Sequence, residues 1–311
     1  MSKLRAAVVG VGYLGRFHAQ KYKNNTAAEL VAVCDGRLEQ AQNVAQELGV
    51  KAVKDPRELI GQVDLVTVAA STQAHYDLGL LFLEAGIPVN MEKPLAATAE
   101  QAQRLVELAE KKKTLLAAGH IERFNPAIVA LKNDLRSPNF IELIRHTAFR
   151  ARGADVSVLH DLMIHDIDLL AWLAGDGEVA DMKAWGHRLI GSSTDAAEVF
   201  VEMKNGLKAR LSASRVSSRP QRAIRVVEKD RALFADTGAL ELETIQPVDL
   251  NAAEPMRTEK KTIEKKDALQ AETDAFIEAV RSGHPPVVSG RDGLRALQIV
   301  EKIEKLLGGP R

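Results

Sequence analysis

The chain has 311 residues, of which 46% are hydrophobic and 27% charged, a composition typical of globular proteins and not of disordered ones. Lysine plus arginine and aspartate plus glutamate number 42 each, so the chain lacks the basic excess that a general nucleic-acid or anionic-membrane surface needs. Cys34 is the single cysteine, which excludes an intramolecular disulfide. The first apolar stretch is too short for a signal peptide, and no segment approaches the roughly 18 apolar residues of a membrane helix. We therefore expect a cytoplasmic protein with no nucleic-acid or membrane partner.

The first 120 residues alternate between strands and helices. Near-continuous apolar strands separated by segments of helical spacing indicate a parallel sheet covered on both faces. The right-handed crossover rule then predicts a doubly wound α/β domain. The predicted strands are Leu4–Val9, Leu30–Cys34, Leu65–Ala70, Ile87–Met91 and Leu115–Ala118, and the predicted helices between them include Leu38–Leu48, His75–Ala85 and Ala99–Lys112.

Residues 121–311 have a different pattern, which predicts a second domain of the α+β class with an antiparallel sheet. A helix is expected at 158–173, and most of the chain beyond it is predicted to be strands, with a strong hairpin signal in the asparagine–glycine pair at 205–206. Two helices should close the chain, the last at 292–307 with an apolar stripe, whereas 254–266 is interpreted as a charged connection. The predicted strands are Ile141–Phe149, Asp181–Leu189, Ala196–Met203, Leu207–Ser214, Ala223–Val227 and Leu240–Ile245.

A glycine-rich turn follows the first predicted strand and precedes a helix. Its glycines would form the tight turn, let the backbone approach a pyrophosphate and pack the helix closely on the strand. Asp35 ends the next strand, where a carboxylate would bind the adenosine ribose and favour NAD over NADP. Arg37 leaves NADP possible, because it could meet a phosphate or stack on adenine, or it could simply be exposed. The expected cofactor contacts in the turn are Gly10, Gly12, Tyr13, Leu14 and Gly15.

Two further groups of residues have the chemistry of a catalytic site. Lys93 follows the strand Ile87–Met91, and ligands of open α/β sheets bind at the carboxyl ends of the strands. Its ammonium could donate to a reacting oxygen, or Lys93 could be an ordinary surface lysine. Asp161 and His165 are four residues apart in a predicted helix, so they share one face. A carboxylate there could orient an imidazole that accepts a proton, or the two could form an ordinary helix-surface pair.

In this order and over nearly the whole chain, these features resemble the Gfo/Idh/MocA oxidoreductases. The resemblance is carried by Gly10–Gly15, Glu92-Lys93-Pro94, Asp161-xxx-His165 and a glycine-rich turn before the last helix. It implies a Rossmann domain at 1–120 and, at 121–311, a domain with a large open antiparallel sheet whose last helix packs back on the first domain. It also implies an active site in the cleft between the domains, a cis peptide bond before Pro94, and a homodimer or homotetramer formed through the open sheet.

The resemblance also assigns catalytic roles. Lys93 and His165 would be catalytic, and Asp161 would assist His165 or bind the substrate. His165 would take a hydroxyl proton while hydride leaves the same carbon, and Lys93 would stabilise the developing oxyanion. His160 is close enough in the sequence to be a second candidate for the base.

The cofactor crevice of the family is lined by the start of the helix that follows the strand Leu65–Ala70. Ser71, Thr72 and His75 would therefore contact the cofactor, although Ser71 or Thr72 could serve only as the helix N-cap. Glu92 would reach the nicotinamide-side ribose. No metal is expected, because no His/Cys cluster has metal-binding spacing. The residues expected to be structural or exposed are His18, His146, Asp166, Asp168, His187 and His284.

Two sequence strings bear on the substrate. Residues 119–126 and 161–168 resemble most closely the branch of the family that contains UDP-N-acetylglucosamine 3-dehydrogenases, which implies oxidation of a sugar 3-hydroxyl in lipid A precursor synthesis. Arg123, Arg150 and Arg152 could bind the diphosphate or form salt bridges, and Asn125 is a further candidate for substrate binding. A dehydrogenase of a free sugar or inositol is the alternative, and a non-catalytic nucleotide sensor is a third interpretation.

Overall fold

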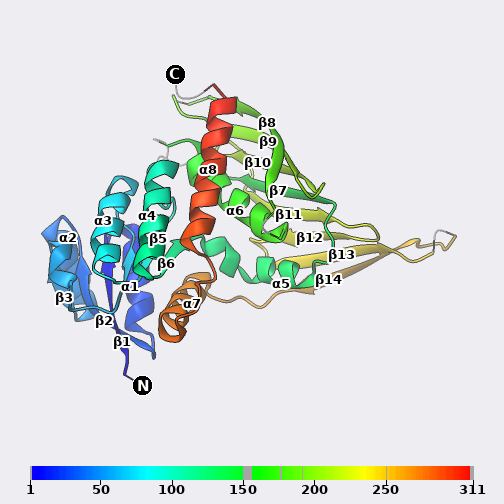
Figure 1. Ribbon diagram of the computed structural model, residues 1–311. Helices are drawn as coiled ribbons and strands as arrows, with labels where there is room; N and C mark the ends of the chain where they lie inside the picture. The colour runs from blue at the N-terminus through cyan, green and yellow to red at the C-terminus, as the bar shows by residue number, and fades with distance from the viewer. Residues whose placement is uncertain (1, 150–155, 176, 191, 250, 309–311) are drawn as a thin grey trace. The chain divides into compact units, whose positions relative to one another are not determined.

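The computed structural model describes residues 2–149, 156–175, 177–190, 192–249 and 251–308 (Figure 1). The chain divides into two compact units. Unit 1 comprises Met1–Ile121 and Asp267–Leu297, and unit 2 comprises Glu122–Lys266 and Gln298–Arg311. Unit 1 thus contains the residues expected in the first domain together with a segment near the C-terminus that was expected in the second. Among the described residues, no helix is long and apolar enough to cross a membrane.

Unit 1 contains a six-stranded sheet in the order β3-β2-β1-β4-β5-β6, with every neighbouring pair parallel. The chain progresses outward from β1 in both directions, so the carboxyl ends of β1 and β4 mark the topological switch point at which such sheets bind ligands. The three-residue strand β3 is too short for periodicity to indicate it, and it was not predicted. The strands are β1 Leu4–Val9, β2 Ala28–Cys34, β3 Lys51–Val53, β4 Leu65–Val68, β5 Val89–Glu92 and β6 Leu116–Gly119.

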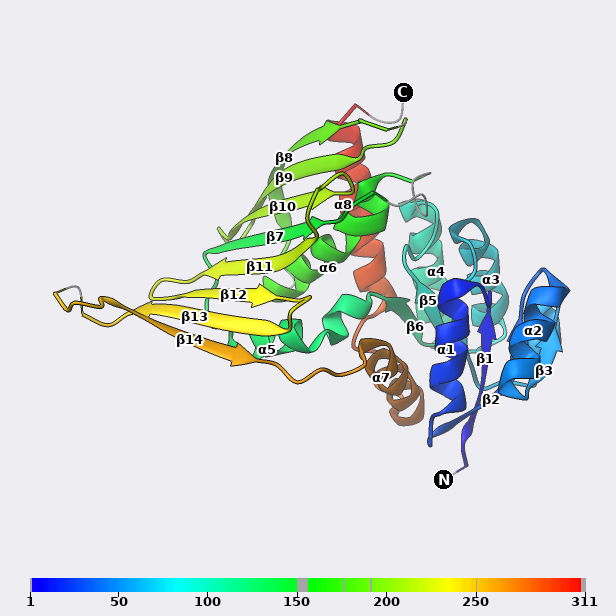
Figure 2. The same ribbon diagram turned by 180° about the vertical axis from the view of Figure 1, so that it is seen from behind.

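Helices cover both faces of this sheet. In Figures 1 and 2, α3 and α4 lie on one face and α1 and α7 on the other. Phe276 and Ile277 of α7 are buried in the same core as Val8 and Tyr22, and this packing places α7 in unit 1 although it follows unit 2 in the sequence. The helices are α1 Tyr13–Lys23, α2 Leu38–Leu48, α3 Thr72–Glu84, α4 Ala99–Lys112, α7 Ala268–Ser282 and α8 Gly290–Leu306, which begins in unit 1 and ends in unit 2.

Unit 2 contains an eight-stranded sheet in the order β14-β13-β12-β11-β7-β10-β9-β8. Its neighbouring strands are antiparallel except β7 and β10, which are parallel. Gly206, at φ +85°, completes the predicted turn between β9 and β10. The strands are β7 Phe140–His146, β8 Val179–His187, β9 Ala196–Met203, β10 Lys208–Ser214, β11 Gln221–Val227, β12 Ala232–Asp236, β13 Glu241–Pro247 and β14 Met256–Thr262.

The prediction that 254–266 is only a connection is wrong, because Met256–Thr262 forms the edge strand β14. All seven of its residues are exposed, so the alternation of apolar and polar side chains that marks a half-buried strand is missing. Lys260 pairs instead with Glu241 and Glu243 on β13. A charged edge of this kind discourages pairing with other chains.

One face of the unit 2 sheet is packed against helices, with α6 on β7 and β10 and α5 on β12 and β13. The helices are α5, Pro126–Asp134, and α6, Ile164–Leu173. Outward-pointing aromatic side chains of Trp185, Phe200 and Phe234 are exposed on the strands. The face that these aromatic residues occupy, opposite the helices, corresponds to the open sheet that the resemblance implied.

Candidate active site

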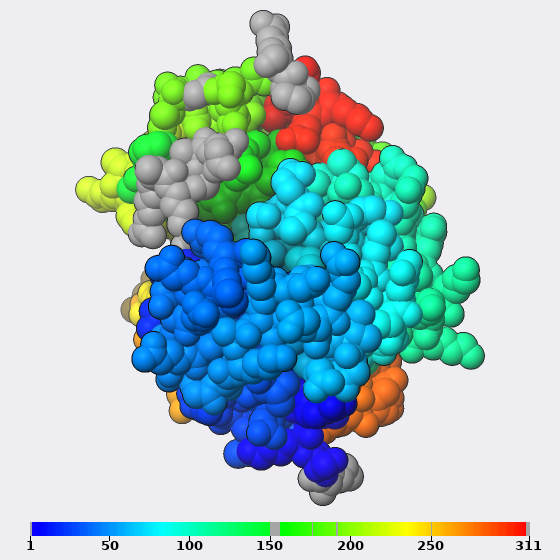
Figure 3. Space-filling view, turned by 90° about the vertical axis from the view of Figure 1, so that its left-hand side faces the viewer, coloured from blue at the N-terminus to red at the C-terminus, as the bar shows by residue number. Residues whose placement is uncertain are grey.

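A pocket of about 560 Å³ lies at the carboxyl ends of β1, β2 and β4 in unit 1. Figure 3 faces this part of the unit, where the blue surface of the β2–α2–β3 segment lies beside the lighter blue and cyan surface of α3. The pocket is at the switch point of the sheet, where the fold predicts a nucleotide. The residues that line it include Gly10, Gly12, Asp35, Gly36, Arg37, Lys54, Ala69, Ser71, Ala74 and Asp77.

The glycine turn has the geometry that a pyrophosphate site requires. A Cβ atom on Gly10 would lie 2.4 Å from the backbone of Ala70, and one on Gly15 would lie 1.8 Å from the carbonyl oxygen of Gly10, so only glycine fits at either position. A Cβ on Gly12 would meet nothing within 4 Å, because this position faces the open pocket. The backbone N–H groups at the start of α1 are therefore accessible to an anion, and these residues fit a bound dinucleotide.

Asp35 is held in place at the end of β2. Its Oδ2 accepts the N–H of Val11 at 3.0 Å, and its Oδ1 accepts the N–H of Arg37 at 2.9 Å. Each carboxylate oxygen can accept a further hydrogen bond, as from a ribose hydroxyl. The Arg37 side chain is 77% exposed. Tyr13 is exposed on the first turn of α1, with Leu14 half-buried beside it.

The start of α3 contributes to the pocket in part. Ser71 is its N-cap residue but makes no side-chain capping bond, and it lines the pocket. Thr72 begins the helix. His75, expected at the crevice, is buried, and its ring nitrogens lie 2.8 Å from the Pro94 carbonyl oxygen and 3.1 Å from that of Ala70. Burial lowers the pKa of His75, although the carbonyl groups of Pro94 and Ala70 oppose this, and the ring links α3 to the segment after β5.

Lys93 lies at the carboxyl end of β5, and its peptide bond to Pro94 is cis, as the resemblance implied. Glu92 is buried. Its Oε1 lies 2.7 Å from Nε2 of His18, and its Oε2 accepts the N–H of Lys93 at 3.2 Å. Gly119 on β6 gives Glu92 room, because a Cβ there would lie 3.2 Å from its carboxyl group.

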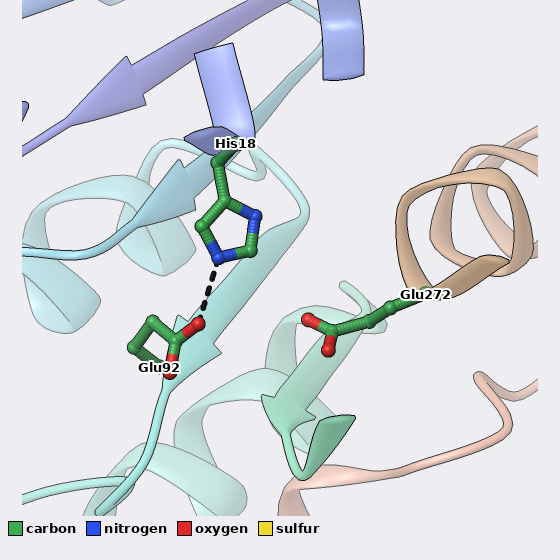
Figure 4. Close-up of side chains that lie close together, drawn as sticks. All are labelled: His18, Glu92 and Glu272. Carbon is green, nitrogen blue, oxygen red and sulfur yellow. Dashed lines mark hydrogen bonds and ion pairs between the residues drawn. The ribbon is translucent and has the colours of Figure 1, made fainter. Parts of the chain in front are cut away.

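A third titratable group completes this cluster. Figure 4 shows the carboxyl group of Glu272, from α7, pointing toward His18 and Glu92. Burial would lower the pKa of His18, but its hydrogen bond to Glu92 and the charge of Glu92 raise it above its ordinary value. Burial would raise the pKa of Glu92, but the hydrogen bond and charge of His18, together with the charge of Lys93, bring it below its ordinary value. Burial and the charge of Glu92 raise the pKa of Glu272 to about 7.

Asp161 and His165 lie in unit 2 and are both half-buried. The predicted α-helix begins with a π-helical turn, Leu159–Met163, that holds Asp161, and α6 proper follows with His165 in its first turn. Four residues span slightly more than one turn of an α-helix and slightly less than one turn of a π-helix. Asp161 and His165 therefore still lie on similar faces. Single π turns within helices occur frequently at functional sites.

Two buried ion pairs fix α6, and both use aspartates that were predicted to be structural. Asp166 accepts three hydrogen bonds from Arg145 on β7, the shortest at 2.8 Å. Asp168 accepts two from Arg123, at 2.8 and 2.6 Å. Burial raises the pKa of Asp166, against the opposing charge of Arg145. With these partners the helix that carries His165 has a fixed position on its sheet.

Two of the predicted substrate-binding residues, Arg123 and Asn125, contact other residues of unit 2. Arg123 is 4% exposed and is neutralised by Asp168, so its contacts do not support diphosphate binding. Asn125 caps α5, accepting the N–H of Ala127 at 3.0 Å and donating to the Thr237 carbonyl at 3.2 Å. His160, the second candidate base, lies 3.1 Å from Glu304. Arg150 and Arg152 lie outside the described residues.

Sequence reasoning missed three residues near these sites. His18 was expected to be structural or exposed, and it is the buried partner of Glu92. Glu272 was not predicted, since an acidic residue in an amphipathic helix gives no local signal. Lys54 adds a positive charge to the pocket, but it follows the strand β3 that was not predicted.

The sequence matches two family profiles along consecutive parts of the chain. Residues 4–120 match an oxidoreductase family with an NAD-binding Rossmann fold, and residues 113–232 match the GFO/IDH/MocA C-terminal domain. A UDP-N-acetylglucosamine 3-dehydrogenase from Acidithiobacillus ferrooxidans is 34% identical over 314 residues, covering 99% of each chain. The chain belongs to the Gfo/Idh/MocA oxidoreductase family.

Other members of the Gfo/Idh/MocA family are also similar over nearly the full length. A myo-inositol 2-dehydrogenase from Thermotoga maritima is 30% identical, covering 98% of this chain and 96% of its own. The solved structure of the Acidithiobacillus ferrooxidans enzyme has a TM-score of 0.93 and 33% identity, covering 99% of this chain and 98% of that one. A probable dehydrogenase from Thermotoga maritima has a TM-score of 0.84 and 28% identity, covering 98% and 97%. These matches confirm the predicted family, fold class and NAD cofactor.

Proposed function

We propose that this Gfo/Idh/MocA oxidoreductase oxidises the 3-hydroxyl of UDP-N-acetylglucosamine to a ketone, with NAD as hydride acceptor. The observation that carries the proposal is the similarity to the UDP-N-acetylglucosamine 3-dehydrogenase, which extends over 99% of both chains. The lysine at the carboxyl end of β5 and the histidine at the start of α6 supply the acid–base groups that alcohol oxidation needs.

Residues of unit 1 bind the cofactor and contact the substrate oxygen. The N-terminus of α1 and the turn at Gly12 receive the pyrophosphate, and Asp35 accepts hydrogen bonds from the adenosine ribose. When bound, NAD supplies the nicotinamide ring that takes up the hydride. The Lys93 ammonium donates to the substrate oxygen and stabilises the negative charge that develops there.

His165 in unit 2 accepts the hydroxyl proton. A neutral imidazole can do this near neutral pH, and Asp161 orients it or holds a neighbouring hydroxyl. The two ion pairs of Asp166 and Asp168 contribute by holding α6 still, because proton transfer depends on a positioned base.

A dehydrogenase of a free sugar or inositol is the second candidate. The similarity to the myo-inositol 2-dehydrogenase, 30% identical over 98% of this chain, favours it. The structural ion pair of Arg123 also favours it, since one of the cations expected to bind a diphosphate is already occupied.

The test is reduction of NAD by the purified protein with UDP-N-acetylglucosamine, followed at the absorbance band of the reduced nicotinamide. A coupled aminotransferase removes the ketone and draws an unfavourable oxidation forward. Turnover that is lost in Lys93→Met and His165→Ala would support substrate and residues together. Turnover only with myo-inositol or a free sugar would replace the first candidate with the second.

Three finer predictions belong with this function. We propose a cytoplasmic enzyme whose ketone product is consumed by an aminotransferase in lipid A precursor synthesis. We also propose a homodimer or homotetramer formed through the open sheet face, which the exposed Trp185, Phe200 and Phe234 support. Light scattering on the purified protein tests the assembly, and a monomer would contradict it.

A further inference from the structure

The buried cluster of His18, Glu92 and Glu272 adjoins the proposed catalytic lysine, and the proposed mechanism makes no use of Glu272. One nitrogen or oxygen atom from each of the three residues lies within 4.8 Å of the other two. All three residues are buried, so each carries a charge or a proton that the surrounding protein has to stabilise. Such a group next to a reactive residue is a candidate for a functional role.

Fixed contacts bring Glu272 to this position. Lys21 of α1 donates to Asp267 at the start of α7 at 2.6 Å, and Asn25 donates to Asp274 farther along the same helix, also at 2.6 Å. Asn90 on β5 donates its side-chain N–H to Oε1 of Glu272 at 3.0 Å. The other oxygen of Glu272, Oε2, is buried and forms no hydrogen bond with any residue that the structure describes.

The geometry favours a shared proton over a metal ion. His18 Nε2 and Glu92 Oε1 lie 2.7 Å apart, which is the distance of a hydrogen bond and places a proton between them. A zinc ion about 2.0–2.2 Å from both atoms would have to displace that proton and separate them further. The cluster as it stands therefore binds protons.

Two buried carboxyl groups so close together do not both ionise readily. His18 neutralises Glu92, so the proton that keeps the cluster uncharged resides on Glu272. The titratable or charged groups that face Glu272 are His18 and Tyr22 from α1 and Glu92 from β5, with Lys93 next to Glu92. Tyr22 is buried and hydrogen-bonded to Thr67, which leaves His18 and Glu92 as the groups that respond to Glu272.

We propose that Glu272 is a positioning residue that acts through Glu92: its neutral carboxyl group completes the buried cluster that fixes Glu92 against the N–H of Lys93. Ionised Glu272 repels Glu92, loosens its hydrogen bond to the Lys93 peptide and misdirects the lysine side chain. The hydride transfer should therefore weaken as Glu272 loses its proton. The inference rests on the proposed function for its link to catalysis, but the link to Lys93 is measurable without substrate.

The experiment compares wild type with Glu272→Gln between about pH 6 and pH 8.5. Glutamine keeps the volume and the acceptor for Asn90 but cannot ionise. The control is Thr273→Val, which removes the neighbouring hydrogen bond from Thr273 Oγ1 to the Leu269 carbonyl inside the same helix. Three quantities are measured: kcat, KM and the rate at which an amine-reactive reagent labels Lys93 in the substrate-free protein. Mass spectrometry reads this rate relative to that of the exposed Lys111.

We expect the ratio of kcat in Glu272→Gln to kcat in wild type to rise with pH, by up to about 30-fold, because a group with a pKa of about 7 is some 97% ionised at about pH 8.5. KM should change less than about twofold, since Glu272 is not among the residues proposed to bind the cofactor or the substrate. The Lys93 labelling rate of Glu272→Gln divided by that of wild type, each normalised to Lys111, should change over the same pH range. For Thr273→Val, this labelling ratio and the ratio of kcat to that of wild type should both stay constant. A flat labelling ratio for Glu272→Gln overturns the inference. A changing labelling ratio without turnover supports it and rejects the substrate.

Discussion

Arg123 and Asp168 are joined by two hydrogen bonds of 2.8 and 2.6 Å, although 45 residues separate them in the sequence. Both side chains are almost completely buried. The pair connects the segment that enters unit 2 with the helix that carries His165. Arg123, which was expected to bind the substrate, thus stabilises the helix that carries the proposed catalytic residue His165.

Replacing Arg123 by methionine should destabilise the protein by about 3–5 kcal/mol, because Asp168 is left as an unpaired buried charge. Urea unfolding measures the change. The control is Arg104→Met, which breaks exposed contacts with Glu100, one turn away on α4, and with Tyr76, and should lower the free energy of unfolding much less. Equal losses in the two variants would contradict the structural role of Arg123.

Replacing Asp35 by alanine should weaken NAD binding about 10- to 100-fold, because hydrogen bonds from the ribose to a fixed carboxylate are lost. NADP should lose much less, since the repulsion between the carboxylate and its 2′-phosphate disappears as well. Calorimetric titration with each cofactor measures both constants. Glu39→Ala, on the exposed first turn of α2, is the matched control, and a parallel loss for NAD and NADP would argue against the role of Asp35.

Replacing Lys93 by methionine should lower kcat by about 10²- to 10⁴-fold, because a positioned donor to the developing oxyanion is lost. The dissociation constant of NAD should remain within about threefold of wild type. Lys111→Met, exposed on α4, provides the comparison for general effects of removing a lysine. A variant that keeps wild-type kcat would remove Lys93 from the mechanism.

The raised pKa of Glu272 also predicts how stability depends on pH. Folded protein keeps the proton up to about pH 7, whereas the unfolded chain releases it near its ordinary value of 4.5. Wild type should therefore lose stability relative to Glu272→Gln as the pH rises from about 4.5 to 7, by as much as about 3 kcal/mol, and the difference should level off above that. Urea unfolding at a series of pH values tests this. A constant difference across the range would show that Glu272 titrates normally in the folded state.

Much of the fold could be predicted because its signals are local. The helices Leu38–Leu48 and Ala99–Lys112 and the strands Leu4–Val9 and Ala196–Met203 have the predicted bounds, since apolar periodicity reports burial directly. The glycine turn could also be predicted from the sequence, because only glycine fits at Gly10 and Gly15 without a steric clash. The resemblance to a family supplied the order of the motifs, including the cis bond before Pro94.

The remaining features depend on residues that meet only in three dimensions. His18 and Glu92 are 74 positions apart, and no spacing rule joins them. The contact of Glu92 with His18 and the space that Gly119 leaves for its carboxyl group could not be predicted from its position at a strand end. The π turn at Leu159–Met163 leaves no trace in hydrophobic periodicity, and the strand Met256–Thr262 buries no side chain that could reveal it.

The return of Asp267–Leu297 to unit 1 has a consequence for how this chain is made. On a ribosome, the six strands of the parallel sheet emerge well before α7, and unit 2 is synthesised in between. Until Phe276 and Ile277 arrive, the apolar surface that they cover around Val8 and Tyr22 stays uncovered, and Glu92 lacks its neighbour from α7. The nascent nucleotide-binding half is thus incomplete for most of its synthesis, and a nascent-chain chaperone has its longest opportunity to bind during that interval.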